Sequence, residues 1–134
     1  MVVRDAAKAI TFYEHVLGAR LVDRTDLPGP DGTMLVAHAV LDFGHGLLQL
    51  GDAMPAHHLV LPPEGDDACF SLGYYCPDVD AVVQRALMAG AVLREPTTTF
   101  VSGGLVWVTH GVMPTEPAWL LGSTSRAAPG TQGG

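Results

Sequence analysis

One pattern occurs twice in this chain, about 73 residues apart. An aspartate (Asp5, then Asp78) precedes a run with apolar residues at helical spacing, and a Gly-Ala pair (18–19, then 90–91) follows it. Aspartate is a favoured residue at a helix N-cap, and glycine commonly follows the C-terminus of a helix. The repeat therefore predicts two copies of one supersecondary unit, with helices over residues 6–17 and 79–89. The residues expected to face inward are Ala6, Ala9, Ile10, Tyr13, Val16 and Leu17, and then Val79, Val82, Val83, Ala86 and Leu87.

The segments around each helix have the composition of strands and turns. Strands are predicted over residues 19–24, 34–42 and 47–50 in the first half, and over 69–75, 91–95, 105–110 and 118–122 in the second. Residues 25–33, which contain Pro-Gly-Pro-Asp-Gly, predict a loop, and residues 43–46 predict a hairpin turn. Only four residues precede Asp5, so the first strand is expected to be incomplete.

These elements predict an α+β fold made of paired βαβββ modules. The modules span residues 1–52 and 68–122 of a single domain, joined by a proline-rich linker at 53–67 and followed by a flexible tail at 123–134. In each module the helix covers one face of the sheet, so two modules must pair to cover the other. The two uncovered faces then form a cleft.

Composition excludes several classes of function. Seven basic against fourteen acidic residues give a net charge of −7, which argues against binding to nucleic acid. No apolar run approaches the length of a membrane span, and the first residues do not resemble a secretion signal, so we expect a cytoplasmic protein. Cys69 and Cys76 are seven residues apart, a spacing typical of neither a metal pair nor a redox pair.

Residues 3–19 (Val-Arg-Asp-Ala-Ala-Lys-Ala-Ile-Thr-Phe-Tyr-x-x-Val-Leu-Gly-Ala) resemble the opening signature of the vicinal oxygen chelate superfamily. This superfamily contains glyoxalases, bleomycin-resistance proteins and extradiol dioxygenases. The segments 38–41, 47–52, 78–81, 85–86 and 90–91 look most like its PhnB-like branch. The resemblance covers residues 2–122 and implies the glyoxalase/bleomycin-resistance fold and a homodimer. Between the last two strands this chain departs from the pattern Asp-Pro-x-Gly-His-x-Trp, keeping a proline and Trp119.

In metal-dependent members of that superfamily, His or Glu side chains at fixed strand positions hold the ion. The first position lies seven residues before each capping aspartate, which falls outside this chain for Asp5 and on Ser71 for Asp78. The others fall on Gln49 and Leu120. Divalent metals need three or four nitrogen, carboxylate or thiolate donors. The resemblance therefore implies no metal and no other cofactor at these positions.

Four histidines elsewhere are candidates for substitute ligands. His57 and His58 lie in the proline-rich linker, where a solvated loop pair is the favoured interpretation. His38 and His110 lie on predicted strands, where each can serve as a hydrogen-bonding residue of the cleft. They remain open as non-standard metal ligands.

Alternation along the strands sorts side chains between the helix and the cleft. On the third strand a small apolar set suits the helix side, which assigns Val36, together with Met34 and His38, to the cleft. Trp107 is the candidate for stacking against a ligand, whereas Trp119 is expected to pack beneath a helix. The predicted ligand-binding residues are Met34, His38, Gln49, Ser71, Tyr75, Trp107 and Thr109. No catalytic residue is assigned.

The favoured hypothesis is a small-molecule-binding protein of the bleomycin-resistance type, which sequesters an aromatic drug or metabolite in a metal-free cleft. The net negative charge would favour a cationic ligand. The alternative is a glyoxalase-type metal-dependent lyase or isomerase that uses non-standard ligands such as His38 and His110. A third interpretation is an accessory protein whose cleft has lost its activity.

Overall fold

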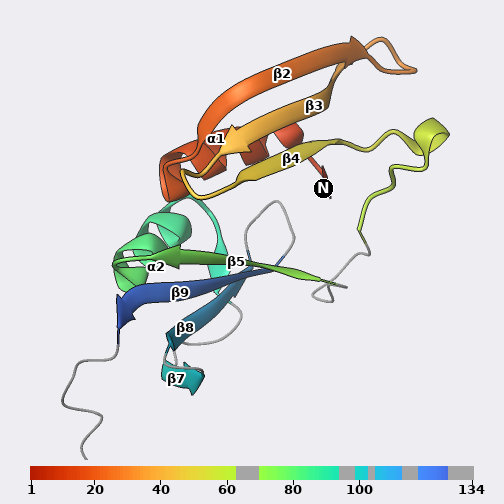
Figure 1. Ribbon diagram of the computed structural model, residues 1–134. Helices are drawn as coiled ribbons and strands as arrows, with labels where there is room; N and C mark the ends of the chain where they lie inside the picture. Colours follow the sequence, from red (N-terminus) through yellow and green to blue (C-terminus); the bar gives the residue numbers. More distant parts are fainter. Residues whose placement is uncertain (63–69, 94–98, 103–104, 113–117, 127–134) are drawn as a thin grey trace, which may run out of the picture. The chain divides into compact units, whose positions relative to one another are not determined.

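The computed structural model describes residues 1–62, 70–93, 99–102, 105–112 and 118–126, the last three segments through their backbone pairing. The chain divides into two compact units, residues 1–67 and 68–134, and each is described by itself. Figure 1 shows the elements of both. In the part of the chain that is described, no helix is long and apolar enough to cross a membrane.

The first unit places one helix against a four-stranded sheet. Its strands lie in the order β1-β4-β3-β2, with β1 parallel to β4 and the other neighbours antiparallel. The short 3-10 turn η1 follows the sheet (Figure 1). The elements are β1 (Val2–Val3), α1 (Ala6–Leu17), β2 (Arg20–Pro28), β3 (Met34–Asp42), β4 (Leu47–Asp52) and η1 (Pro55–His57).

The second unit repeats this topology. Its strands lie in the order β5-β9-β8-β6, β7 also pairs with β8, and β5 is parallel to β9. β5, β9 and β8 thus correspond to β1, β4 and β3, which confirms the predicted α+β fold with a repeated βαβββ module. The elements are β5 (Ser71–Cys76), α2 (Val79–Met88), β6 (Val92–Leu93), β7 (Thr99–Ser102), β8 (Leu105–Val112) and β9 (Ala118–Arg126).

Strand boundaries differ from the predictions where pairing outweighs local composition. Residues 25–28, predicted as loop, belong to β2 because they pair with the start of β3. β9 continues to Arg126, through the first four residues of the predicted tail, and pairs there with Leu105. β7 was not predicted. β6 lies within the predicted strand at 91–95, whose residues 94 and 95 are outside the described residues. Residues 127–134 lie outside the described residues.

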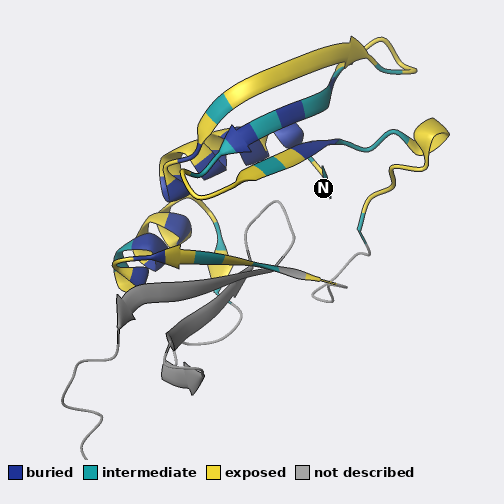
Figure 2. Cartoon of the chain, viewed as in Figure 1, coloured by how far each residue is buried: buried dark blue, intermediate teal, exposed yellow. Residues whose placement is uncertain are grey.

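The predicted N-caps of both helices are confirmed, and the predicted buried faces are confirmed almost completely, but α2 ends at Met88, one residue before the predicted end. Asp5 accepts a hydrogen bond from the Lys8 N–H (3.0 Å), and Asp78 accepts one from the Ala81 N–H (3.1 Å). All six inward residues predicted for α1 are buried, as are four of the five predicted for α2, shown in dark blue in Figure 2. Leu87 is 39% exposed, so that prediction is wrong. One residue beyond the buried Ala86, Leu87 is rotated about 100° around the helix, off its apolar stripe.

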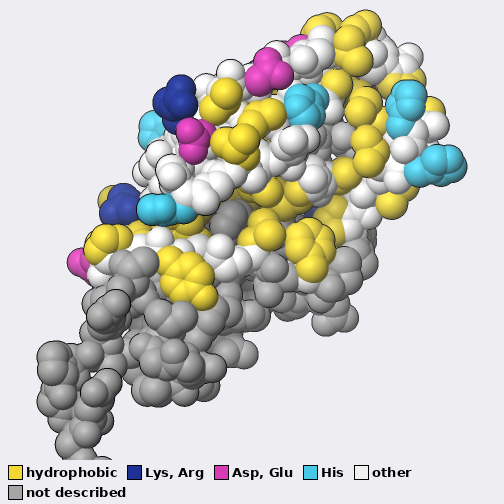
Figure 3. All heavy atoms as spheres, in the orientation of Figure 1, with side chains coloured by type: hydrophobic (Ala, Val, Ile, Leu, Met, Phe, Trp, Pro, Cys, Tyr) yellow, Lys and Arg dark blue, Asp and Glu magenta, His cyan; other side chains and the backbone are white. Residues whose placement is uncertain are grey.

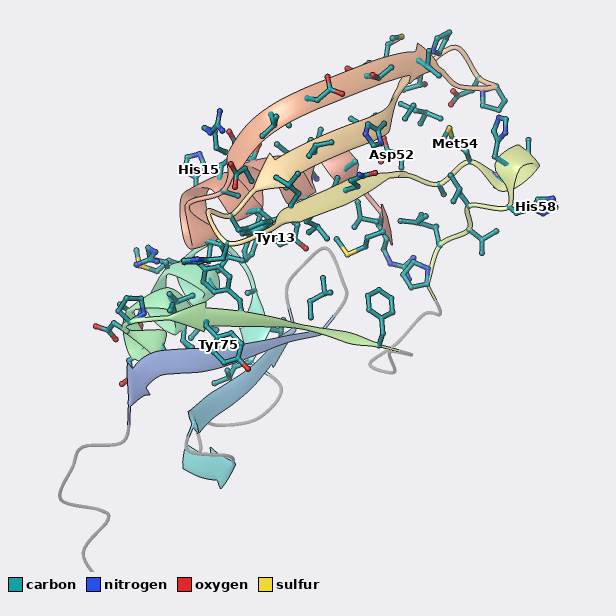
Figure 4. All side chains as sticks on the ribbon, in the orientation of Figure 1. Tyr13, His15, Asp52, Met54, His58 and Tyr75 are labelled. Carbon is teal, nitrogen blue, oxygen red and sulfur yellow. The ribbon has the colours of Figure 1, made fainter. Side chains whose placement is uncertain are left out.

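Aspartate 52 ties the helix of the first unit to its sheet. One carboxylate oxygen accepts a hydrogen bond from the Ala6 N–H at the start of α1, and the other accepts one from the Val36 N–H on β3, both at 2.8 Å. Figure 4 shows Asp52 at the end of β4. The carboxylate therefore satisfies one of the free N–H groups at the helix N-terminus and a strand N–H at the same time.

A bulge in β3 lies beside this carboxylate. The β2–β3 register passes from Thr25↔His38 to Asp26↔Val36 and leaves Ala37 without a partner. β4 approaches the bulge so closely that a Cβ on Gly51 would lie 2.7 Å from the Ala37 carbonyl oxygen. Only glycine fits at this position without a shift of the backbone.

Replacing Gly51 with alanine is expected to lower the free energy of unfolding by about 1–2 kcal/mol, because the new methyl group must displace backbone rather than a side chain. Urea denaturation followed by circular dichroism measures the change. The matched control is Gly46→Ala, where an added Cβ meets nothing within 4 Å. The control should stay within about 0.5 kcal/mol of the wild type. Equal effects in the two variants would contradict this account of the bulge.

Candidate functional site

The helix-free face of the first sheet carries two of the predicted ligand-binding residues. Ala39, Leu41 and Leu50 are buried, so their positions define the face that packs against α1. His38 and Val40 alternate with them along β3 and are half-buried, and Gln49 pairs directly with Val40 across the β3–β4 ladder. Directly paired residues share a face of a sheet. The structure therefore places His38 and Gln49 on one face of the sheet. Gln49 lies directly across from Val40, and His38 lies two residues before Val40 on β3.

The bulge separates Met34 from this pair. Val36 is only 3% exposed, although simple alternation assigned it to the open face. The unpaired Ala37 reverses the alternation, so Val36 belongs with the core and that assignment is wrong. Met34 lies two residues before Val36 and is 58% exposed. By alternation it belongs to the face of Val36 and not to the face of His38.

Charged groups at the borders of this sheet are mostly paired. Asp42 accepts hydrogen bonds from the Gly44 N–H (2.7 Å) and from the Arg20 guanidinium (3.2 Å), which lower the pKa of its carboxyl group. Arg24 and Asp26 form an ion pair at 2.8 Å, and this hydrogen bond lowers the pKa of Asp26 as well. Both carboxylates are therefore ionised at neutral pH. Each of them is balanced by the arginine with which it pairs.

In the second unit, β5 presents one tyrosine to each face. Cys76 is buried on the side of α2 and Tyr74 is half-buried, and burial raises the pKa of each. Tyr75, between them, is 39% exposed on the helix-free face (Figure 4). Gly73 shares the parity of Tyr75 on this strand. Ser71 begins the strand and pairs with Ala118.

Backbone register places the remaining predicted residues of the second unit. Tyr75 pairs with Gly122 on β9, and Gly122 pairs with Trp107 on β8, so these three positions form one row across the sheet. The β8–β9 register then shifts and places His110 opposite Leu120. Thr109 lies within that shift. The strand pairing thus places Tyr75 and Trp107 in one row, on either side of Gly122. Thr109 lies in an irregular part of the ladder.

The linker histidines lie away from the open face of the first sheet. His57 ends η1, and His58 follows it in the left-handed backbone region with φ = 63°. In Figure 4 the side chain of His58 projects away from the strands. Exposed Leu59, Val60 and Leu61 come next, and Figure 3 shows hydrophobic side chains and histidines at the surface along this part of the chain.

The donor set of the described residues does not fit a divalent metal. Among the residues whose side chains are described, no three His, Cys, Asp or Glu gather closely enough to hold an ion. On the open face of the first sheet, the neighbouring row beside His38 offers the neutral amide of Gln49, which is a poor ligand for a divalent ion. His38 and His110 belong to different units, so their pairing as ligands stays a prediction.

Comparison with known proteins identifies the family. A family model described as the Glyoxalase/Bleomycin resistance protein/Dioxygenase superfamily matches residues 1–117. The chain belongs to this superfamily, which is the one that its sequence motifs resemble.

Two mycobacterial proteins without an assigned function are related over nearly the whole chain. Mb0911c of Mycobacterium bovis is 33% identical over 131 residues, which cover 94% of this chain and 81% of the relative. Rv0887c of Mycobacterium tuberculosis has the same identity over 94% of this chain and 72% of its own length. These relatives support the family assignment without naming a ligand.

Solved structures share the fold. The crystal structure of TioX from Micromonospora sp. ML1 matches with a TM-score of 0.57 and 23% identity over 96% of this chain and 98% of that chain. FosX from Listeria monocytogenes, a fosfomycin resistance protein, matches with a TM-score of 0.65 and 10% sequence identity over 93% of this chain and 88% of that chain. PA1353 from Pseudomonas aeruginosa matches with a TM-score of 0.66 and 17% sequence identity over 92% of each chain. At these identities the likeness shows the fold alone.

Proposed function

We propose that this chain is a small-molecule-binding protein that sequesters an aromatic compound without a bound metal. The observation that carries the proposal is the composition of the open face of the first sheet. There an apolar Val40 lies beside His38 and Gln49, which offer hydrogen bonds but no set of metal ligands. Binding sites for small organic molecules commonly combine apolar surface with a few such polar groups.

A resistance-type role is the narrower form of this proposal. The structural neighbours include proteins named for fosfomycin resistance, and the family itself is named in part for bleomycin resistance. Sequestration requires only contacts that bind the ligand, whereas catalysis also requires reactive groups or a metal ion. The competing function is a metal-dependent lyase or isomerase that uses non-standard ligands.

Three planar probes of different charge test the proposal: proflavine (a cation), 2-naphthol (neutral) and naphthalene-2-sulfonate (an anion). Isothermal titration calorimetry should detect binding of proflavine and 2-naphthol, with the sulfonate weakest because the chain carries a net charge of −7. His38→Ala and Gln49→Ala should each weaken binding about 5- to 10-fold, the equivalent of one hydrogen bond. Glu14→Ala, on the exposed side of α1, is the matched control and should bind normally.

Elemental analysis of the protein, purified without added metal, separates the two functions. Substoichiometric zinc, nickel, manganese and iron together with probe binding would support sequestration. A stoichiometric ion that is lost in His38→Ala would instead establish the metal-dependent alternative. Failure of the wild type to bind any of the three probes would overturn the proposal.

The proposal also includes membership of the PhnB-like branch, a cytoplasmic location and a homodimer. β1 pairs with Gly51 and Asp52, and the Met1 amino group donates a hydrogen bond to the Gln49 carbonyl oxygen (2.9 Å), so residues 47 and 48 of β4 meet no described strand along that edge. An open strand edge favours coverage by another chain, and a second copy is the simplest cover. Sedimentation equilibrium tests the dimer, and a monomer at micromolar concentration would exclude it.

A further inference from the structure

A bulge in β2 determines which of its side chains lies beside Val40 on the open face of the first sheet. The β2–β3 register passes from Leu21↔Leu41 to Asp23↔Val40 and leaves Val22 as the extra residue. In a regular ladder Val22 would follow Leu21 and lie opposite Val40, whereas the bulge brings Asp23 there. Bulges often re-aim a side chain beside a binding site. Here the effect is to place a carboxylate next to an apolar residue.

The half-buried Val40 therefore has a polar residue on each side of it. Asp23 pairs with it from β2 and Gln49 pairs with it from β4, so the three positions form one row on one face of the sheet. Thr25 and His38 form the next pair on this face, two residues further along each strand. The apolar centre of the face is thus bordered by a carboxylate, an amide, an imidazole and a hydroxyl group.

The carboxylate of Asp23 has no counter-charge within residues 1–62. It is the one charged side chain of β2, β3 and β4 that forms neither an ion pair nor a hydrogen bond with a described residue. The others are Arg20 paired with Asp42, Arg24 paired with Asp26, and Asp52, which accepts hydrogen bonds from two backbone N–H groups. Arg24 follows Asp23 in sequence but lies opposite the buried Ala39, on the helix side of the sheet. The exposed charge of Asp23 is therefore free to attract a cation.

The pairing of Asp23 with Val40 restricts where such a cation carries its charge. Residues paired directly across antiparallel strands have Cβ atoms about 5 Å apart. A flat ring that lies on Val40 therefore has the Asp23 carboxylate beside its edge. A positive charge spread over the ring, or held on a nitrogen attached to it, meets the carboxylate in this position. Such a nitrogen can donate a charge-assisted hydrogen bond to the carboxylate.

We propose that Asp23 is a specificity-determining residue, whose carboxylate binds the ring-borne positive charge of a planar heteroaromatic cation lying on Val40. The inference rests on the proposed function and specifies both the class of the ligand and the residue that selects it. His38 and Gln49 offer hydrogen bonds to the remaining polar groups of the ligand. The net charge of the chain attracts cations in general, whereas Asp23 gives the charge a fixed partner on the binding face.

Removal of this one charge is the direct test, with proflavine as the cation and 2-naphthol as the neutral probe in calorimetric titrations. Asp23→Asn should weaken proflavine binding about fivefold, as expected for one exposed ion pair, and leave 2-naphthol within twofold of the wild type. The matched control is Glu14→Gln, which removes the same charge from the exposed side of α1 and should bind both probes normally. Raising NaCl from about 10 mM to about 150 mM should weaken proflavine binding more in the wild type than in Asp23→Asn.

Three results would overturn the role of Asp23 and leave the proposed function standing, provided that the wild type binds the probes. Equal losses of proflavine affinity in Asp23→Asn and Glu14→Gln would assign the effect to net charge. An equal loss of 2-naphthol affinity in Asp23→Asn would assign it to a disturbed face. Unchanged proflavine binding would mean that Asp23 serves only to keep β2, the outer strand of the sheet (Figure 1), from pairing with other chains. A wild type that binds neither proflavine nor 2-naphthol would overturn both proposals.

Discussion

Replacing Tyr13 with alanine should lower the free energy of unfolding by about 3–5 kcal/mol, the usual cost of removing a buried aromatic side chain. Tyr13 is fully buried, with Phe12 and Phe43 in edge-on contact at ring-centroid distances of 5.8 and 6.1 Å. Phe43 belongs to the turn between β3 and β4, so the three rings join α1 to that turn. Alanine would leave a cavity at this junction and remove both ring contacts.

Urea denaturation of Tyr13→Ala measures this loss, and Glu14→Ala provides the comparison. Glu14 is the next residue of the same helix and is exposed, so its replacement should change the free energy of unfolding by about 0.5 kcal/mol or less. A loss below about 1 kcal/mol for Tyr13→Ala would contradict the buried position of the ring.

Asp52→Ala should lower the free energy of unfolding by about 2–4 kcal/mol, because it leaves two partly buried N–H groups without an acceptor. Those groups belong to Ala6 and Val36. Asp52→Asn should cost roughly half as much, because an amide has one acceptor oxygen and would present its NH2 group to the second N–H. The stability series wild type, Asn, Ala therefore tests whether both carboxylate oxygens are used.

The control for Asp52 is Asp5→Asn. Asp5 also caps α1, through the hydrogen bond that it accepts from the Lys8 N–H, and asparagine is an equally good N-cap residue. Its replacement should be nearly neutral. If Asp5→Asn and Asp52→Asn cost the same, the second hydrogen bond of Asp52, to the Val36 N–H, contributes nothing measurable to stability.

The helices and the repeat could be predicted from the sequence because their signals are local. A capping aspartate, an apolar stripe and a terminal glycine lie within one helix length, as they do around α1. Strand boundaries depend on partners that lie far away in the chain. For this reason the composition of residues 25–28 predicts a loop where a strand forms, and β7, which depends on β8, was not predicted.

The same distinction explains which parts of the candidate site could be predicted. The shared face of His38 and Gln49 was predicted correctly, because β3 has no bulge between His38 and Val40 and Val40 pairs directly with Gln49. Val36 was assigned wrongly because a bulge has no signature in a period-two pattern. Gly122 was visible in the sequence, but its place between Tyr75 and Trp107 follows only from the strand register.

The unpaired Ala37 has a consequence for how this family is aligned. Deleting that single residue would make β3 a regular strand in which Val36 and the residues before it keep their present faces and partners. A relative without the extra residue would therefore carry the same polar and apolar order in one residue fewer. An alignment that ignores the insertion would match Val36 with positions that face solvent and would misjudge which ancestral substitutions the core tolerated.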